Sequence, residues 1–119
     1  GLVEDARGKG AEVIEVNPAG EDFGNANQRK MPLTVLRGVN DDMTVMQEEI
    51  FGPVLPVMTY KAVDQAVDYV NEHDRPLGLY YFGEDKSEQE RVLTRTISGG
   101  VTTNDVVFHV SMEDLPFGG

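Results

Sequence analysis

VLPVMTYKAVDQAVDYVNEH, residues 54–73, places a strand pattern directly before a helix pattern. The stretch from Val54 to Tyr60 is mostly apolar and follows a Gly-Pro turn, which predicts a strand. In residues 62–73, apolar side chains recur at helical spacing while acids line another face, which predicts an amphipathic helix. The apolar positions of this helix are Val63, Ala66, Val67 and Val70.

The same alternation continues toward the C-terminus. Residues 78–82 contain two tyrosines and a phenylalanine, which predicts a buried strand. Ser87 and Glu90 fit a capping box that starts another helix, reaching about Ile97, and a last strand is expected at 101–104. Strands that alternate with helices favour crossover connections. We therefore predict an α/β fold with a mostly parallel sheet and helices on its faces.

Toward the N-terminus the helical pattern is weaker. Residues 11–16 and 31–39 are predicted strands, and the polar stretch 20–30 between them is predicted to be a surface loop or disordered. The Asn-Asp-Asp sequence at 40–42 supplies N-cap candidates for a brief helix through about Glu48.

Composition limits the classes of protein that the chain can be. A length of 119 residues fits one compact domain, and its 39% of apolar residues lie in short clusters that predict no membrane span. Twenty-one acids against ten Lys and Arg give a net charge of −11, which argues against nucleic-acid binding because phosphate contacts need clustered cations. The chain has no cysteine, which excludes disulfides and thiolate metal sites and is compatible with a cytoplasmic location.

The chain starts with glycine instead of methionine, shows no secretory signal and stops at a Gly-Gly pair, so we expect both ends to be trimmed.

The sequence gives little support to metal binding or nucleophilic catalysis by these residues. His73 and His109 lack acids at metal-ligand spacing, and we expect no metal site. Ser98 and Ser111 lack the glycine context of a nucleophile elbow, so no catalytic residue is assigned.

The most unusual segment, residues 48–54, reads Glu-Glu-Ile-Phe-Gly-Pro-Val at the start of a predicted strand. Loops at strand ends are where ligands bind in α/β sheets. A carboxylate such as that of Glu49 can accept hydrogen bonds from two neighbouring hydroxyls, as on a ribose, and the ring of Phe51 offers a flat apolar face. The alternative is a helix end followed by a phenylalanine of the core.

A second candidate site combines Asn104 and Asp105, at the end of the last strand, with Phe117 beyond the loop that follows. Loops on a rigid scaffold commonly shape pockets. The alternative is that Phe117 belongs to the core and that its neighbouring glycines only form turns.

Residues 48–54 also match, at all seven positions, a signature segment of the aldehyde dehydrogenase superfamily. Three further segments resemble family motifs in family order, namely Gly-Leu at 78–79, Gly-Gly-Val-Thr-Thr-Asn-Asp at 99–105, and Leu-Pro-Phe-Gly-Gly at 115–119. The resemblance covers the chain from about Lys30 to its end. The Asn-Asp pair, a valine-rich loop and Leu-Pro-Phe-Gly-Gly look closest to the branch that oxidises fatty and aromatic aldehydes, including coniferyl aldehyde dehydrogenases.

This resemblance implies specific roles. In the family the second acid of the signature binds the hydroxyls of the nicotinamide ribose, which falls on Glu49. The phenylalanine two residues later packs near the nicotinamide ring, which falls on Phe51. Phe117 corresponds to a residue beside the aldehyde entrance, and Asn104 and Asp105 lie at the strand end that leads into the substrate tunnel.

The departures from the family matter as much. Family enzymes form a thiohemiacetal on a cysteine, transfer hydride to NAD or NADP, and use a glutamate to activate water. This chain has no cysteine, and the nucleophile and the dinucleotide-binding half of the family precede the region it resembles. We therefore expect residues 1–119 to be an inactive part of the catalytic domain of a larger homodimeric or homotetrameric enzyme. The alternative is a free-standing α/β module that binds a ligand or partner without catalysis.

Overall fold

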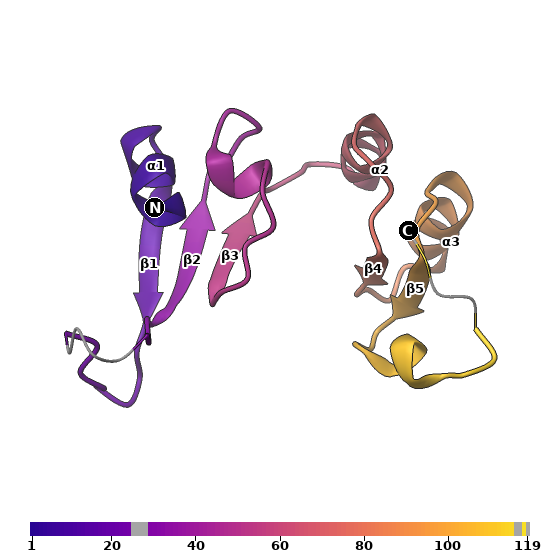
Figure 1. Cartoon of the computed structure of the whole chain (residues 1–119). Helices are drawn as coiled ribbons and strands as arrows, with labels where there is room; N and C mark the ends of the chain where they lie inside the picture. The colour runs from indigo at the N-terminus through magenta and orange to yellow at the C-terminus, as the bar shows by residue number, and fades with distance from the viewer. Residues whose placement is uncertain (25–28, 116–117, 119) are drawn as a thin grey trace. The chain divides into compact units, whose positions relative to one another are not determined.

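The computed structural model describes residues 1–24, 29–115 and 118, and Figure 1 shows the course of the chain. Contacts divide the chain into two compact units, 1–59 and 60–119, where the length alone had predicted one compact domain. None of the helices in the described part of the chain is long and apolar enough to cross a membrane.

The first unit contains a three-stranded sheet, in the order β1, β2, β3. The strands are β1 (Glu12–Val16), β2 (Leu33–Arg37) and β3 (Val54–Val57). β2 and β3 pair in parallel, which the long connection between them allows. β1 pairs antiparallel with β2, so the prediction of a mostly parallel sheet does not extend to this strand.

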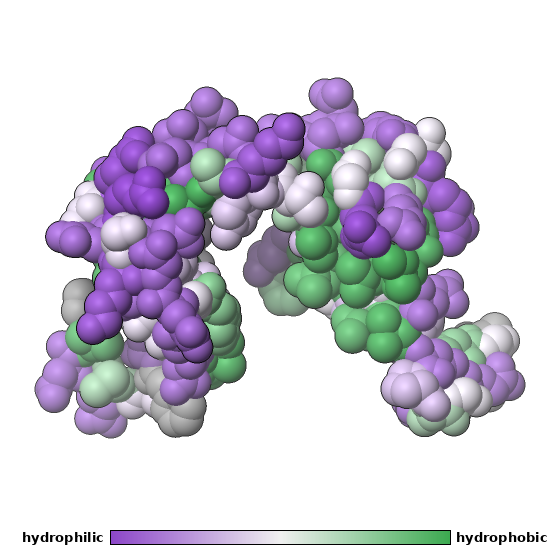
Figure 2. All heavy atoms as spheres, turned by 180° about the vertical axis from the view of Figure 1, so that it is seen from behind, coloured by the Kyte–Doolittle hydropathy of each residue, from purple (hydrophilic) through white to green (hydrophobic). Residues whose placement is uncertain are grey.

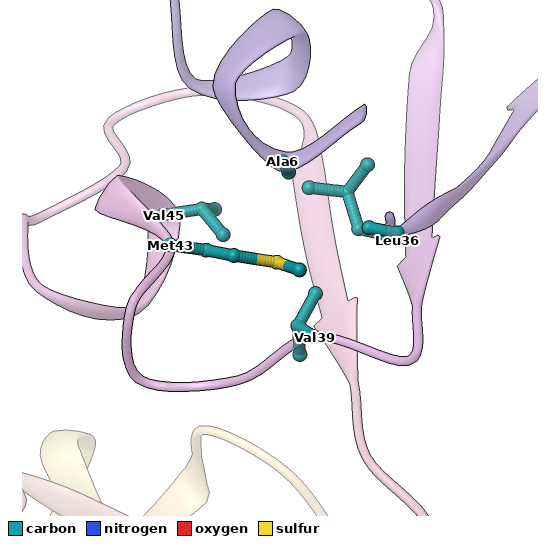
Figure 3. Packing of buried hydrophobic residues seen from close by; sticks show 6 residues of the cluster. Ala6, Leu36, Val39, Met43 and Val45 are labelled. Carbon is teal, nitrogen blue, oxygen red and sulfur yellow. The ribbon is translucent and has the colours of Figure 1, made fainter. Parts of the chain in front are cut away.

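Helix α1 (Leu2–Gly8) and the 3-10 turn η1 (Thr44–Met46) cover one face of this sheet. Their side chains converge on Leu36 of β2, as Figure 3 shows, and Ala6, Leu36 and Met43 are fully buried. The sequence pattern did not predict α1, which spans only seven residues and has no side-chain cap at its N-terminus. The helix predicted through Glu48 shortens to the single turn η1.

The opposite face of the same sheet is apolar and open. The strand registers place Ile14, Val35 and Leu55 in one row across the three strands, on the side away from the buried Leu36. Figure 2 shows the resulting hydrophobic area over this unit. Its side chains are half-buried or exposed, and they are Ile14, Val16, Leu33, Val35, Leu55 and Val57.

The second unit contains helix α2 (Val63–Glu72) and a β-α-β arrangement of β4 (Gly78–Tyr81), α3 (Lys86–Arg95) and β5 (Gly100–Thr103). β4 and β5 pair in parallel, which confirms the predicted crossover through a helix. Val63, Val67, Tyr81 and Val92 form the core between the helices and this strand pair. Asp64 of α2 binds both Arg91 and Arg95 of α3, at 3.1 and 2.5 Å, so the two helices are also joined by ion pairs.

The predicted cap of α3 is wrong by two residues. Asp85, with extended backbone angles, is the N-cap, and its Oδ1 accepts hydrogen bonds from the backbone N–H groups of Ser87 and Glu88 at 2.8 and 3.2 Å. Ser87 lies inside the first turn and donates its hydroxyl hydrogen to the same oxygen. The pattern of an N-cap acceptor followed by Glu three residues later also fits Asp85 and Glu88, and the charged carboxylate of aspartate is a stronger hydrogen-bond acceptor than a hydroxyl.

Candidate functional site

The segment between η1 and β3 presents Glu49 and Phe51 to solvent. Glu49 follows the C-cap of η1 by two residues, and its side chain is exposed. Among the described residues its carboxylate has no hydrogen bond or ion pair. Phe51 is 89% exposed, so within these 119 residues it does not belong to the core. A free carboxylate and a free aromatic face thus lie two residues apart.

The backbone of Phe51 is strained. Its φ of +42° lies in the left-handed region, which costs an L-residue with a bulky side chain on the order of 1–3 kcal/mol. Burial of the ring does not offset this cost, because the ring is exposed. Backbone strain that the local packing does not repay is a common property of ligand-binding segments.

The segment is held firmly at its exit into β3. The backbone N–H of Thr34 donates to the carbonyl of Pro53 at 2.8 Å, and the N–H of Val54 donates to the carbonyl of Gly52 at 2.8 Å. Thr34 is buried in β2. The position of Phe51 is therefore tied to the parallel pair of β2 and β3.

A cavity of about 340 Å³ lies beside this segment within the first unit. Its lining is mainly apolar and comes from α1, from Met31 before β2, and from the residues at the start of β3. The residues are Gly1, Leu2, Val3, Glu4, Met31, Ile50, Phe51, Gly52 and Val54. Phe51 thus forms part of the wall of this cavity while most of its surface is exposed to solvent.

The second predicted group of residues lies in the other unit. Asn104, with φ of +54°, ends β5, and its backbone N–H donates to the carbonyl of Tyr81 at 2.7 Å. Its side-chain amide both accepts from the N–H of Gly83 at 2.9 Å and donates to the carbonyl of Gly83 at 3.0 Å. Asn104 therefore fastens the end of β5 to the turn after β4.

Asp105 is exposed, and its Oδ1 accepts the backbone N–H of Val106 at 2.8 Å. Phe117, the third residue of this group, lies outside the described residues. Its predicted position beside an aldehyde entrance stays a prediction.

The sequence did not predict the contacts that His109 makes. His109 belongs to the 3-10 turn η2 (Phe108–Ser111), and its Nδ1 lies 3.0 Å from the hydroxyl of Thr102. The imidazole packs against the backbone of Gly78 and Gly100, which face each other across β4 and β5. A side chain at Gly100 would collide with the imidazole. The sequence feature that could have indicated this contact is a glycine at the start of each of the two parallel strands, because a glycine in a strand leaves room for another group to approach the backbone closely.

A second cavity, of about 360 Å³, lies beside His109 in this unit. It is lined by the end of α3 and the start of β5, together with Leu115 from the C-terminal segment. The remaining lining residues are Leu93, Thr96, Ile97, Ser98, Gly99, Gly100 and Val101. The turn η2 therefore contributes to the wall of an apolar hollow.

The sequence model described as the Aldehyde dehydrogenase family matches residues 1–119, the whole chain. The chain belongs to the aldehyde dehydrogenase family. The superfamily resemblance seen at residues 48–54 is thereby confirmed, and the family is one of oxidoreductases.

Two relatives of this aldehyde dehydrogenase chain are coniferyl aldehyde dehydrogenases by name. It is 67% identical over 119 residues to a probable coniferyl aldehyde dehydrogenase of Caulobacter vibrioides, covering 24% of that protein. It is 55% identical over 115 residues to the coniferyl aldehyde dehydrogenase of a Pseudomonas species, covering 97% of this chain and 24% of that protein. The chain thus spans about a quarter of the length of the curated relatives it matches.

Solved aldehyde dehydrogenases share the fold. A substrate-bound enzyme of Staphylococcus aureus matches with a TM-score of 0.79 and 35% identity, over 99% of this chain and 24% of that one. An aldehyde dehydrogenase of Pseudomonas syringae, solved with NAD+ and octanal, matches with a TM-score of 0.79 and 28% identity, over 98% of this chain and 23% of that one. These matches confirm the α/β class.

Proposed function

We propose that residues 1–119 are part of the catalytic domain of an NAD(P)-dependent aldehyde dehydrogenase, and that Glu49 and Phe51 position the nicotinamide end of the cofactor. The observation that carries this proposal is the free carboxylate of Glu49 two residues before Phe51, whose backbone is strained and whose side chain is exposed. Family membership and the coverage of about a quarter of the relatives support it.

The two side chains fit a nicotinamide riboside chemically. The carboxylate of Glu49 has both oxygens available to accept hydrogen bonds from the two ribose hydroxyls. The ring of Phe51 offers an apolar surface for the planar nicotinamide and helps to exclude water. When bound, NAD or NADP supplies the hydride acceptor of the reaction. Glu49 and Phe51 fix the orientation of that acceptor, which is where positioning residues contribute to rate.

The bond-making chemistry belongs to residues outside this chain. The chain has no cysteine, so the nucleophile that forms the thiohemiacetal must come from elsewhere in the full-length protein. We expect the 119 residues alone to be inactive.

For the aldehyde, the names of the relatives favour an aromatic substrate such as coniferyl aldehyde, with a long-chain aldehyde as the alternative. Asp105 and Phe117 are proposed to line the substrate tunnel. Asn104 has its amide occupied by Gly83, so we propose that it contributes by shaping the strand end. The homodimer or homotetramer and the cytoplasmic location of the full-length protein stay predictions.

The test is NAD(P)H production from coniferyl aldehyde and from octanal, by the 119-residue chain and by the full-length protein. We expect turnover by the full-length protein alone, and faster turnover with coniferyl aldehyde. No turnover by a folded full-length protein with either aldehyde would favour the non-catalytic binding module instead.

A further inference from the structure

The carboxylate of Asp5 in α1 reaches a segment 39 residues away in the sequence. Its Oδ2 accepts the backbone N–H of Thr44, the first residue of η1, at 2.8 Å. Its Oδ1 forms an ion pair with Lys9 at 2.8 Å, and the Lys9 ammonium also donates to the carbonyl of Asp42 at 2.6 Å. Asp5 of α1 and Lys9 at its C-cap therefore bind the first N–H group of η1 and the segment before it.

The contact continues through η1 to the residue before Glu49. The carbonyl of Thr44 accepts the backbone N–H groups of Gln47 and Glu48, at 3.0 and 3.1 Å. These bonds join Glu48 to the same residue whose N–H group Asp5 binds, so the backbone of Thr44 links the two contacts. Asp5 thus anchors Thr44, and Thr44 anchors Glu48, which lies one residue before the proposed ribose-binding acid.

Asp5 also caps the N-terminus of η1, because the residues next to η1 supply no side-chain cap. The N-cap of η1 is Met43, whose side chain is fully buried and makes no capping hydrogen bond. An acidic acceptor supplied from α1 replaces the missing cap. The carboxylate is held in its charged form, because hydrogen bonds from Lys9 and then from the Thr44 N–H keep the pKa of Asp5 below its ordinary value.

From these contacts we infer that Asp5 is a positioning residue for Glu49, acting through Thr44 and Glu48 on the placement of the ribose-binding carboxylate. The inference rests on the proposed function of Glu49. The segment carrying Glu49 is hydrogen-bonded at two places, at Glu48 on one side and at Pro53 on the other. Loss of the first anchor leaves Glu49 free to move relative to β3.

The experiment uses the full-length protein with NAD+ and coniferyl aldehyde, and measures the single-turnover rate of NADH formation at 25 °C. Asp5→Ala should slow this rate on the order of tenfold, the scale of effect of a small misplacement of a positioning group. Asp5→Asn should restore the rate to within about threefold of the unaltered protein, because its amide oxygen can still accept the Thr44 N–H. A purely structural or charge effect would not follow this order.

A second variant removes the same hydrogen bond from the donor side. Thr44→Pro deletes the N–H at the first position of the turn, where proline is well tolerated, and Met43 already has the extended angles that a following proline requires. It should slow the reaction as Asp5→Ala does, and it decides the question if Asp5→Ala does not fold. Glu12→Gln, which removes only a surface pair with Arg37 in the same unit, is the matched control and should leave the rate unchanged.

Combining Asp5→Ala with Glu49→Gln distinguishes failure of the inference about Asp5 from failure of the proposed function of Glu49. If Asp5 acts through Glu49, adding Asp5→Ala to Glu49→Gln should slow the reaction by no more than about twofold further. The same tenfold loss in both backgrounds would overturn the inference and leave the role of Glu49 intact. An unchanged rate in Glu49→Gln alone would instead overturn the proposed function of Glu49, and the inference with it.

Discussion

Phe51 is a residue whose backbone conformation lowers the stability of the folded chain. Its φ of +42° favours glycine, and its ring is 89% exposed, so neither backbone nor packing explains a phenylalanine there. Contact with the nicotinamide would explain it. Residues kept for ligand binding at the expense of stability are expected at functional sites.

Phe51→Gly therefore gives opposite results for stability and activity. In the full-length protein we expect the free energy of unfolding, measured in urea, to rise by up to about 1 kcal/mol because the backbone strain is relieved. Turnover should fall severalfold, and the KM for NAD+ should rise. Phe82→Gly, at an exposed phenylalanine without a positive φ, is the control and should lower stability. A loss of stability in Phe51→Gly, or unchanged turnover, would contradict this account.

The sequence predicted Glu49 and Phe51 through their motif, but not how they are held. The free ring of Phe51 contradicts the core position that its apolarity alone would favour. The contact of His109 with Gly78 and Gly100 depends on the register of two strands that are distant in the sequence. No local pattern records such a register, so that contact required the structure.

Secondary-structure elements were predictable where their patterns were long. The helix expected at 62–73 is α2, and the strands around α3 lie within a few residues of their predicted bounds. Short elements were not predictable: α1 has seven residues and η1 three, and tertiary packing on Leu36 stabilises them. The antiparallel direction of β1 also follows from tertiary pairing and not from its composition.

The cap of α3 makes a prediction about pH. Hydrogen bonds from Ser87 and then from the Glu88 N–H lower the pKa of Asp85, so its charged form is favoured in the folded state. The stability that it contributes is therefore present above its ordinary pKa, near pH 4, and is lost as the pH falls through the lower folded value.

Asp85→Asn keeps a capping oxygen but cannot titrate. In urea unfolding of the full-length protein between pH 7 and pH 2.5, the unaltered protein should lose its advantage over this variant below about pH 4. A difference in unfolding free energy that stays constant over that range would show that the Asp85 charge does not stabilise the cap.

At the scale of the whole molecule, the sheet of the first unit leaves an apolar face open (Figure 2). Strand periodicity predicted apolar side chains there, but not which face α1 and η1 would cover. The division into two units was likewise beyond the reach of length and composition. Open apolar faces of this kind drive association when nothing covers them.

We therefore expect the 119-residue chain, expressed alone, to self-associate in sedimentation velocity at micromolar concentration. Leu55→Lys places a charge in the middle of the open face, where Leu55 is 53% exposed, and should shift the chain toward monomer. Thr59→Lys adds the same charge at an exposed position beyond β3 and should not. Equal association of both variants would assign self-association to another surface.

In the proposed function Glu49 orients the nicotinamide end of the cofactor, and substitution of Glu49 tests this role. In the full-length protein, Glu49→Gln should slow hydride transfer, measured as the single-turnover rate of NADH formation from coniferyl aldehyde, on the order of tenfold or more. Glu48→Gln, which alters only the exposed side chain of the neighbouring acid and keeps the backbone N–H that binds Thr44, should leave that rate near its original value. Unchanged hydride transfer and unchanged NAD+ affinity in Glu49→Gln would contradict the account.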